Sequence, residues 1–167
     1  MEKAYTPSHI ANFFLDKAEE EGARLTQMKL QKLVYIGYGW ALALLNRRVF
    51  EEQIEAWQHG PVIPSLYHEF KHFGSSPITN KAVEYNFDSE QIFCHPKVDA
   101  SDEGLNFVLE KAWDTYKHFN AWALRNKTHE PNTPWAMIYD PKVSGKVIPP
   151  DLIREYYRNE IESLLNV

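Results

Sequence analysis

The sequence predicts an α+β fold that is mainly α: a compact single helical domain with a small antiparallel sheet, spanning residues 1–167. Three observations support this prediction. Apolar residues recur at helical spacing in several segments, only a few short segments alternate as strands do, and no linker, repeat or low-complexity tract divides the chain. The length of 167 residues suits one domain, and an apolar fraction of 44% is typical of a globular protein.

The first helix is expected to begin at Pro7, with the hydroxyl of Thr6 as its N-cap, and to end near Gly22. The acidic residues 19–21 stand at its C-terminal end, where they oppose the helix macrodipole. We therefore expect this end either to fray in solvent or to meet a basic partner.

The second helix is expected to run from Thr26 to about Asn46. Its start is amphipathic, and from Leu33 onward it is apolar nearly all round, as is typical of a central core helix. Glycine is costly inside a helix, so Gly37 and Gly39 indicate that a neighbouring element packs closely against them.

Residues 54–57 alternate between apolar and polar side chains and predict a short strand. A turn is expected at residues 59–62, and then a third helix over residues 64–73, which Gly74 ends. Strands are also expected at residues 85–87, 91–93 and 146–148, and helices at residues 120–124 and 150–165, with a short turn capped by residues 133–135. A further helix is expected to follow an N-cap near Asp99 or Ser101, with its apolar face running from Leu105 to Tyr116.

The charge balance disfavours nucleic acid as the main partner. The net charge is −5, whereas binding to phosphates needs clustered lysine and arginine. Arg47 and Arg48 form the one basic pair, which we expect at a solvated helix end. Cys94 has no partner in the chain, which is typical of a reducing cytoplasm. We expect no signal peptide and no membrane span, since the apolar stretch at residues 33–45 is shorter than the roughly 20 residues that a span needs.

Residues 68–72 match the H-E-x-x-H pattern of zinc metalloproteases, with Glu90 as a conceivable third ligand. On a helix, however, His68 and His72 fall roughly opposite the apolar face that holds Leu66 and Phe70. A catalytic zinc helix is enclosed, so we expect two histidines that face water. A metal-dependent hydrolase stays as the alternative of another class.

Cys94 and His95 are adjacent in an expected strand and therefore point to opposite faces, so they make a poor nucleophile and base. No other pattern in the sequence predicts a catalytic centre. We expect a protein that is not an enzyme and that uses no metal or cofactor.

Three segments resemble the Panacea-domain, or SocA-like, phage-associated antitoxin family. Residues 29–35 are similar to its K-L-Q-K-L-x-Y helix, and residues 55–64 are similar to its E-A-W-x-x-G-P-V-x-P segment. Leu124, residues 128–129 and residues 134–135 resemble its L-x-x-x-T-H-x-x-x-P-W ending, with a longer spacing at residues 130–133.

The resemblance implies a mainly helical antitoxin that neutralises a cognate protein toxin encoded nearby. It implies direct binding of the toxin or, alternatively, an adaptor that delivers the toxin to a Clp-type protease. The residues expected to bind the toxin are Lys29, Lys32, Tyr35, Trp57, His59, Gly60, Pro61 and His129.

Each expected binding residue has a structural alternative. The aromatic residues could belong to the core, the Gly-Pro pair could shape a tight turn, and His129 could serve a local hydrogen bond. The two lysines are the strongest candidates for an exposed surface, because lysine is rarely buried.

Overall fold

The computed structural model describes residues 4–88, 90 and 93–166, and it confirms a compact, mainly helical α+β fold. The helices are α1 (Pro7–Glu20), α2 (Gln27–Leu45), α3 (Pro64–Phe70), η1 (Lys71–Phe73), α4 (Glu103–Tyr116), α5 (Ala121–His129), α6 (Pro134–Ile138) and α7 (Pro150–Leu165). The strands are β1 (Glu55–Trp57), β2 (Gly60–Val62), β3 (Glu84–Tyr85), β4 (Phe93–Cys94) and β5 (Lys146–Val147).

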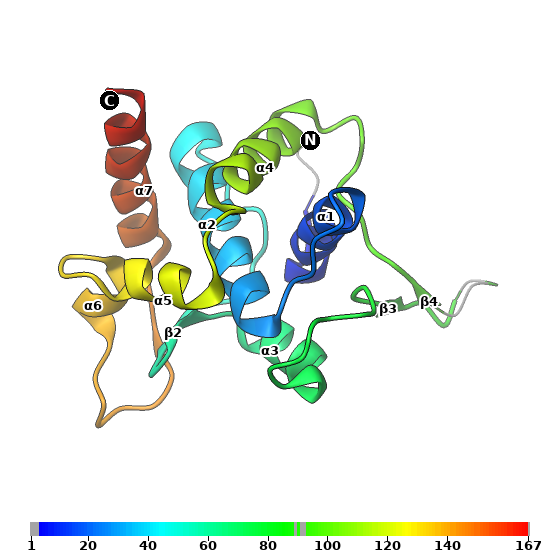
Figure 1. The fold of residues 1–167 in the computed structure, drawn as a ribbon, viewed down its shortest axis with the longest axis horizontal. Helices are drawn as coiled ribbons and strands as arrows, with labels where there is room; N and C mark the ends of the chain where they lie inside the picture. The colour runs from blue at the N-terminus through cyan, green and yellow to red at the C-terminus, as the bar shows by residue number, and fades with distance from the viewer. Residues whose placement is uncertain (1–3, 89, 91–92, 167) are drawn as a thin grey trace.

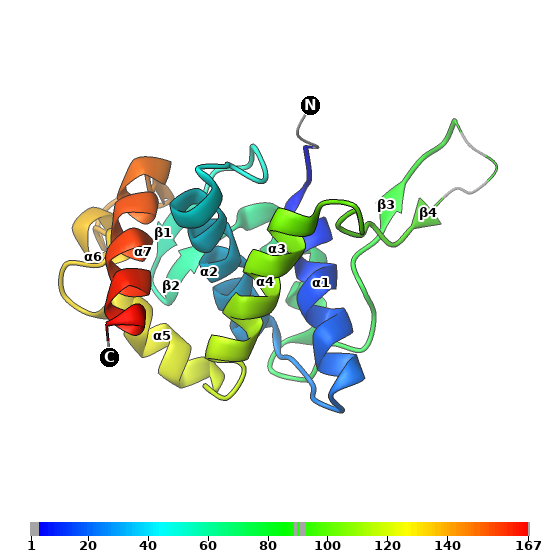
Figure 2. The ribbon, with the colours of Figure 1, turned by 90° about the horizontal axis from the view of Figure 1, so that it is seen from above.

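Helix α2 lies at the centre of the molecule, as its apolar sequence predicts. It contacts α1 and α4 on one side, α7 on the other, and also α3, α5 and β2 (Figures 1 and 2). The side chain of Thr26 caps its start by accepting a hydrogen bond from the backbone of Lys29. Asn46 ends it in the left-handed conformation, with φ of 49°.

The two glycines inside α2 mark close helix contacts, as expected. A Cβ atom at Gly39 would run into the ring of Tyr157 on α7, and one at Gly37 would lie 2.9 Å from Leu109 Cδ2 on α4. The absence of side chains at these positions therefore lets α7 and α4 approach the backbone of α2.

The three-stranded sheet is antiparallel with the order β2-β1-β5. The expected turn at residues 59–62 is too long, because residues 60–62 pair with β1 and only Gln58 and His59 connect the strands. Gly60 makes this tight reversal possible with φ of 117°. Pro61, which has no N–H, is tolerated because β2 lies at the edge of the sheet.

The second sheet, β3-β4, is a small hairpin that extends away from the helices (Figure 2). Its strands lie at Glu84–Tyr85 and Phe93–Cys94, shifted slightly from the expected residues 85–87 and 91–93. Gln91 and Ile92, which the second of these expected strands includes, lie outside the described residues.

Arg47 is not at a solvated helix end, as the sequence suggested. Its guanidinium is buried and forms an ion pair with Asp102, with 2.9 Å between Nη1 and Oδ2. Asp102 also caps the N-terminus of α4 by accepting from the backbone of Leu105. Arg48 stays at the surface and donates hydrogen bonds to the backbone carbonyls of Phe50 and Glu51.

The acidic end of α1 is not frayed. Glu21 accepts hydrogen bonds from the Trp113 indole and, at 2.7 Å, from the amine of Lys117. Glu19 pairs with Lys81 at 3.1 Å. The basic partners of these carboxylates therefore come from the same chain.

Helix α5 continues to His129, beyond the expected end at residue 124. No helix in the described ranges combines the length and the apolar character that crossing a membrane would require.

Candidate functional site

The segments that carry the family resemblance meet at one place in the fold. The Gln31 side chain on α2 donates to the backbone carbonyl of Ile63 at 3.3 Å and accepts from its N–H at 3.2 Å. The next residue on the same helix, Lys32, donates its Nζ to the carbonyl of Pro61 at 3.2 Å. These bonds fasten the β1-β2 hairpin to the start of α2.

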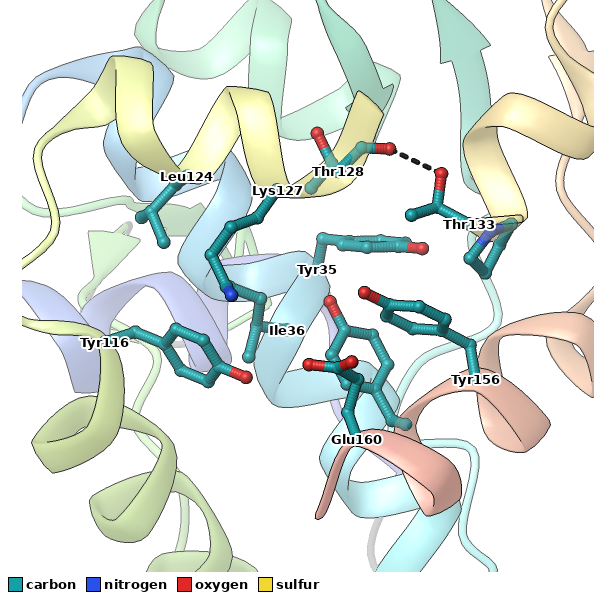
Figure 3. A pocket seen from close by; sticks show the side chains of 11 residues that line it. Tyr35, Ile36, Tyr116, Leu124, Lys127, Thr128, Thr133, Tyr156 and Glu160 are labelled. Atoms are coloured by element: carbon teal, nitrogen blue, oxygen red, sulfur yellow. Dashed lines mark hydrogen bonds between the residues drawn. The ribbon is translucent and has the colours of Figure 1, made fainter. Parts of the chain in front are cut away.

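The third segment attaches to the same hairpin through α5 and α6. Trp135 donates its indole N–H to the carbonyl of Trp57 at 2.6 Å. The ring of His129 stacks on Trp135 with 3.7 Å between centroids. Thr133 ties the two helices by donating its hydroxyl to the carbonyl of Thr128 at 2.8 Å (Figure 3).

Lys32 is buried, which corrects the expectation that it lies on an exposed polar face. Its exposed fraction is 2%, because the β1-β2 hairpin covers this side of α2. Burial, with the Arg125 guanidinium as a second cause, lowers the pKa of its amine from 10.5 to about 7. A Cβ atom at Gly60 would lie 2.9 Å from Lys32 Nζ, so glycine is needed here for space as well as for its positive φ.

Further cationic or titratable groups surround this amine. Burial lowers the pKa of His129 to about 4, and the charge of Arg125 acts in the same direction. Within the described residues, His129 Nε2 and Arg125 Nε are buried and have no hydrogen-bond partner. No carboxylate of the described residues contributes to the pKa of Lys32 or His129. The charges that act on Lys32 and His129 are therefore cationic, with no carboxylate of the described residues to offset them.

A surface groove of about 900 Å³ opens beside this cluster. It lies between the start of α2, the β1-β2 turn, the end of η1 and the start of α5. Its lining residues are Arg24, Thr26, Gln27, Met28, Lys29, Gln31, Lys32, Trp57, Gln58, His59, Val62, Tyr67, Gly74, Ser75, Asn120, Ala121 and Trp122. None of these described lining residues is acidic, although the chain as a whole has a net charge of −5.

The groove brings together four of the residues expected from the sequence: Lys29, Lys32, Trp57 and His59. His59 is exposed, whereas Lys29 is half-buried and donates its amine to the carbonyl of Lys117 at 2.6 Å. Burial lowers the pKa of Lys29.

Three further expected residues support the groove without lining it. Gly60 and Pro61 are buried beneath it and shape the hairpin that forms one wall. His129 lies half-buried behind Lys32, where its charge coupling to Lys32 and its stacking on Trp135 place it in the supporting layer.

Tyr35 is the exception, because it does not lie on an exposed face with the others. It is buried against Tyr157, with 5.8 Å between ring centroids. It borders a separate small cavity of about 10 Å³, roughly the space of one water molecule. Figure 3 shows Tyr35 and Tyr156 extending toward the same space, with Glu160 beside them. Tyr35 faces α7 because it continues the apolar part of α2.

The groove also contains aromatic and basic residues that sequence reasoning missed: Arg24, Tyr67, Trp122 and, behind the wall, Arg125. Trp122 is 59% exposed, and the Arg125 guanidinium lies over its ring at 5.3 Å. In the sequence, the signal for Trp122 was a bulky aromatic residue on the polar side of a short helix. This signal could not locate the groove, because the residues that surround Trp122 in space are distant from it in the sequence.

The H-E-x-x-H segment does not form a metal site in the part of the chain that the structure describes. His68 and His72 are exposed, as helical geometry predicts, and His72 falls in η1 rather than α3. Glu69 accepts a hydrogen bond from the backbone of Val83 at 3.1 Å. Among the described residues, no three His, Cys, Asp or Glu side chains are grouped to hold a metal ion.

Comparison with known proteins gives two matches. The sequence model of a family described as "Antitoxin SocA-like, Panacea domain" matches residues 30–136. The chain is 30% identical to the Antitoxin SocA of Caulobacter vibrioides (strain NA1000 / CB15N) over 130 residues, which cover 77% of this chain and 68% of that protein. No solved structure matches the chain.

Proposed function

The chain belongs to the SocA-like, Panacea-domain antitoxin family, and from this premise we propose that it neutralises a cognate protein toxin by binding it directly. The toxin is expected to be encoded near this chain's gene. The binding surface is the groove between α2, the β1-β2 turn and the start of α5. Binding alone neutralises the toxin, and the protein catalyses no reaction of its own.

One observation carries this proposal: the segments that resemble the family motifs build and brace the groove. Gln31 and Lys32 hold the hairpin, and Trp135 holds the hairpin from its other side. A wall fixed by such hydrogen bonds loses little freedom on binding, which favours affinity.

The side chains at the groove surface suit a protein partner. Trp57, Tyr67 and Trp122 line it, and aromatic residues are enriched among those that dominate binding energy at interfaces. The hydrolase alternative gains no support, since His68 and His72 are exposed and Glu69 bonds to the backbone.

Co-expression with the neighbouring open reading frame tests the proposal. We expect the neighbour to be toxic alone, growth to be restored by this chain, and the two proteins to purify as a complex. A harmless neighbour, or toxicity that persists with this chain abundant, would contradict the proposal.

A matched pair of variants tests the location of the binding surface. Trp122 on α5 and Phe107 on α4 are 59% and 60% exposed, and each lies beneath a cation, Arg125 at 5.3 Å and Lys111 at 5.4 Å. Only Trp122 lines the groove. We expect Trp122→Ala to weaken toxin binding at least tenfold in calorimetry and Phe107→Ala to leave it unchanged. Equal effects of the two would place the toxin elsewhere.

The lifetime of the toxin distinguishes binding alone from delivery to a protease. We expect the neutralised toxin to persist in cells at the same level with and without a Clp-type protease. Its loss only when the protease is present would indicate an adaptor instead.

A further inference from the structure

The groove contrasts in charge with the rest of the molecule. Arg24, Lys29 and Lys32 line it together with His59, and no acidic side chain of the described residues does, although the chain has an excess of acidic residues. Glu55 accepts the indole N–H of Trp57 at 3.1 Å, but it does not line the groove. The groove is therefore a local basic surface on an acidic protein.

The two lysines of the groove have hydrogen-bond acceptors but no carboxylate partner among the described residues. Lys29 and Lys32 each donate to a backbone carbonyl, of Lys117 and Pro61, with no carboxylate at either amine. Behind them, Arg125 Nε and His129 Nε2 have no hydrogen-bond partner among the described residues. A buried cation without an anion is costly, and an incoming carboxylate would reduce that cost.

The groove also has an apolar side and an unused acceptor. Trp57, Tyr67 and Trp122 offer aromatic surface beside the cations. Gln27, which lines the same groove, has a buried Oε1 with no donor among the described residues. A peptide supplies both an apolar side chain for the aromatic rings and a backbone N–H for this acceptor.

From these features, and resting on the function proposed above, we propose that the groove binds an acidic peptide segment of the partner protein. A carboxylate of that segment pairs with Lys29 and Arg24, the basic side chains of the groove that are not fully buried. An adjacent aromatic or aliphatic side chain packs between Trp57 and Trp122. The partner's acidic segment is thus recognised by charge and by an apolar anchor together.

Single-stranded nucleic acid, which also pairs cations with aromatic rings, fits the molecule less well. Affinity for a phosphate backbone grows with the number of phosphates neutralised, whereas the groove is lined by only three lysine and arginine residues, on a chain of net charge −5. One or two carboxylates match that limited charge better than a row of phosphates.

A matched peptide pair tests the groove without the toxin. The full chain, labelled for NMR, is titrated with acetyl-Glu-Phe-Glu-amide and with its neutral counterpart acetyl-Gln-Phe-Gln-amide. We expect the acidic peptide to shift the indole signals of Trp57 and Trp122, with a dissociation constant at least tenfold lower than that of the neutral peptide. Equal binding of both peptides, or shifts confined to other signals, would overturn the proposal. The proposal would also be overturned if an oligothymidine shifted the Trp57 and Trp122 signals and the acidic peptide did not.

Charge variants in the toxin complex test the same idea separately from the proposed function. Lys29→Gln removes a cation of the groove, and Lys111→Gln removes an exposed cation of α4. We expect Lys29→Gln to lower toxin affinity at least fivefold, with a larger loss of affinity at low salt than at high salt. We expect Lys111→Gln to leave toxin affinity unchanged. A wild-type complex that is unaffected by Lys29→Gln would overturn the acidic-segment proposal while the antitoxin function stands. Failure of the wild-type chain to bind the toxin would count against the function itself.

Discussion

A lysine amine that folding removes from water is costly in its charged form, and Lys32 shows how the chain accommodates that cost. Its amine donates a hydrogen bond to the carbonyl of Pro61, and burial brings its pKa to about 7. Near neutral pH the amine therefore passes between charged and neutral forms inside the fold. The lack of a side chain at Gly60 leaves the space that the amine occupies.

The buried amine predicts a pH dependence of stability. Since the folded pKa of about 7 lies below 10.5, the unfolded chain binds more protons between these pH values. The free energy of unfolding should therefore rise with pH above 7, by up to about 1.4 kcal/mol per pH unit. We expect Lys32→Met to lack this rise and to be at least as stable as the wild type at pH 7, as measured by urea unfolding at pH 7, 8 and 9.

The control for this prediction is Lys142→Met, which changes an exposed lysine and should keep the wild-type rise. Among the described residues, Arg125 and His129 on α5 are the charged or titratable groups that interact with the Lys32 amine. His129, with a pKa of about 4, stays neutral over this pH range. A Lys32→Met curve parallel to that of the wild type would show that the Lys32 amine does not titrate in this way.

The position of Lys32 illustrates what sequence periodicity can and cannot predict. Helical spacing correctly placed it beside Lys29, one turn apart, and away from the apolar face. Its burial comes from the β1-β2 hairpin, which is distant in sequence and covers the polar face of α2. The same holds for Arg47, whose partner Asp102 caps the N-terminus of α4.

At the scale of elements, α2 determines how the others are arranged. Helices α4 and α7 pack against it at its glycines, and the hairpin and α5 cover its N-terminal half. The sequence predicted both features, because a helix that is apolar nearly all round must be covered on every side and its glycines favour close neighbours. It did not predict the full length of α5, whose second half is polar and is stabilised through Thr128 and His129 by residues that follow it.

Close packing at Gly39 predicts the effect of adding one methyl group. A Cβ at this position meets the ring of Tyr157, which is buried and cannot move aside freely. We expect Gly39→Ala to lower the free energy of unfolding by about 1–3 kcal/mol, despite the better helix propensity of alanine. Chemical unfolding measured by circular dichroism gives this difference directly.

Gly104, near the start of α4, serves as the control for Gly39. A Cβ there would lie 3.6 Å from Leu45, an ordinary contact distance. Gly104→Ala should therefore be neutral or slightly stabilising, by up to about 1 kcal/mol. A Gly39→Ala variant as stable as Gly104→Ala would mean that α7 does not pack as closely on α2 as the structure indicates.

At the scale of the whole molecule, three sequence segments converge on one groove. The family resemblance identified the segments, and the chain folds them together through backbone-directed hydrogen bonds from Gln31, Lys32 and Trp135. The sequence alone could not separate groove residues from bracing residues, because both types occur in the same motifs. The basic groove on an acidic chain also becomes visible only in three dimensions, since Arg24, Lys29 and His59 are not neighbours in the sequence.

The shared core predicts that the chain unfolds as a single unit. Elements at both ends of the fold, α1 and α7, bury their apolar faces against the same helix, α2. The buried apolar residues of the described chain, apart from Val62, accordingly form one connected cluster. Removing any large part would expose the surface of α2, so partial unfolding should cost nearly as much as complete unfolding.

The five tryptophans allow this prediction to be tested, because they lie on elements from the centre to the edges of the fold: Trp40, Trp57, Trp113, Trp122 and Trp135. We expect the urea transition followed by tryptophan fluorescence to coincide with that followed by far-ultraviolet circular dichroism, with a single midpoint. Fluorescence that changes at lower urea than helicity would show that the groove side, with Trp57, Trp122 and Trp135, unfolds separately from the α1-α2-α4 side. In that case the groove would not be braced by the core, and its rigidity could not contribute to partner binding.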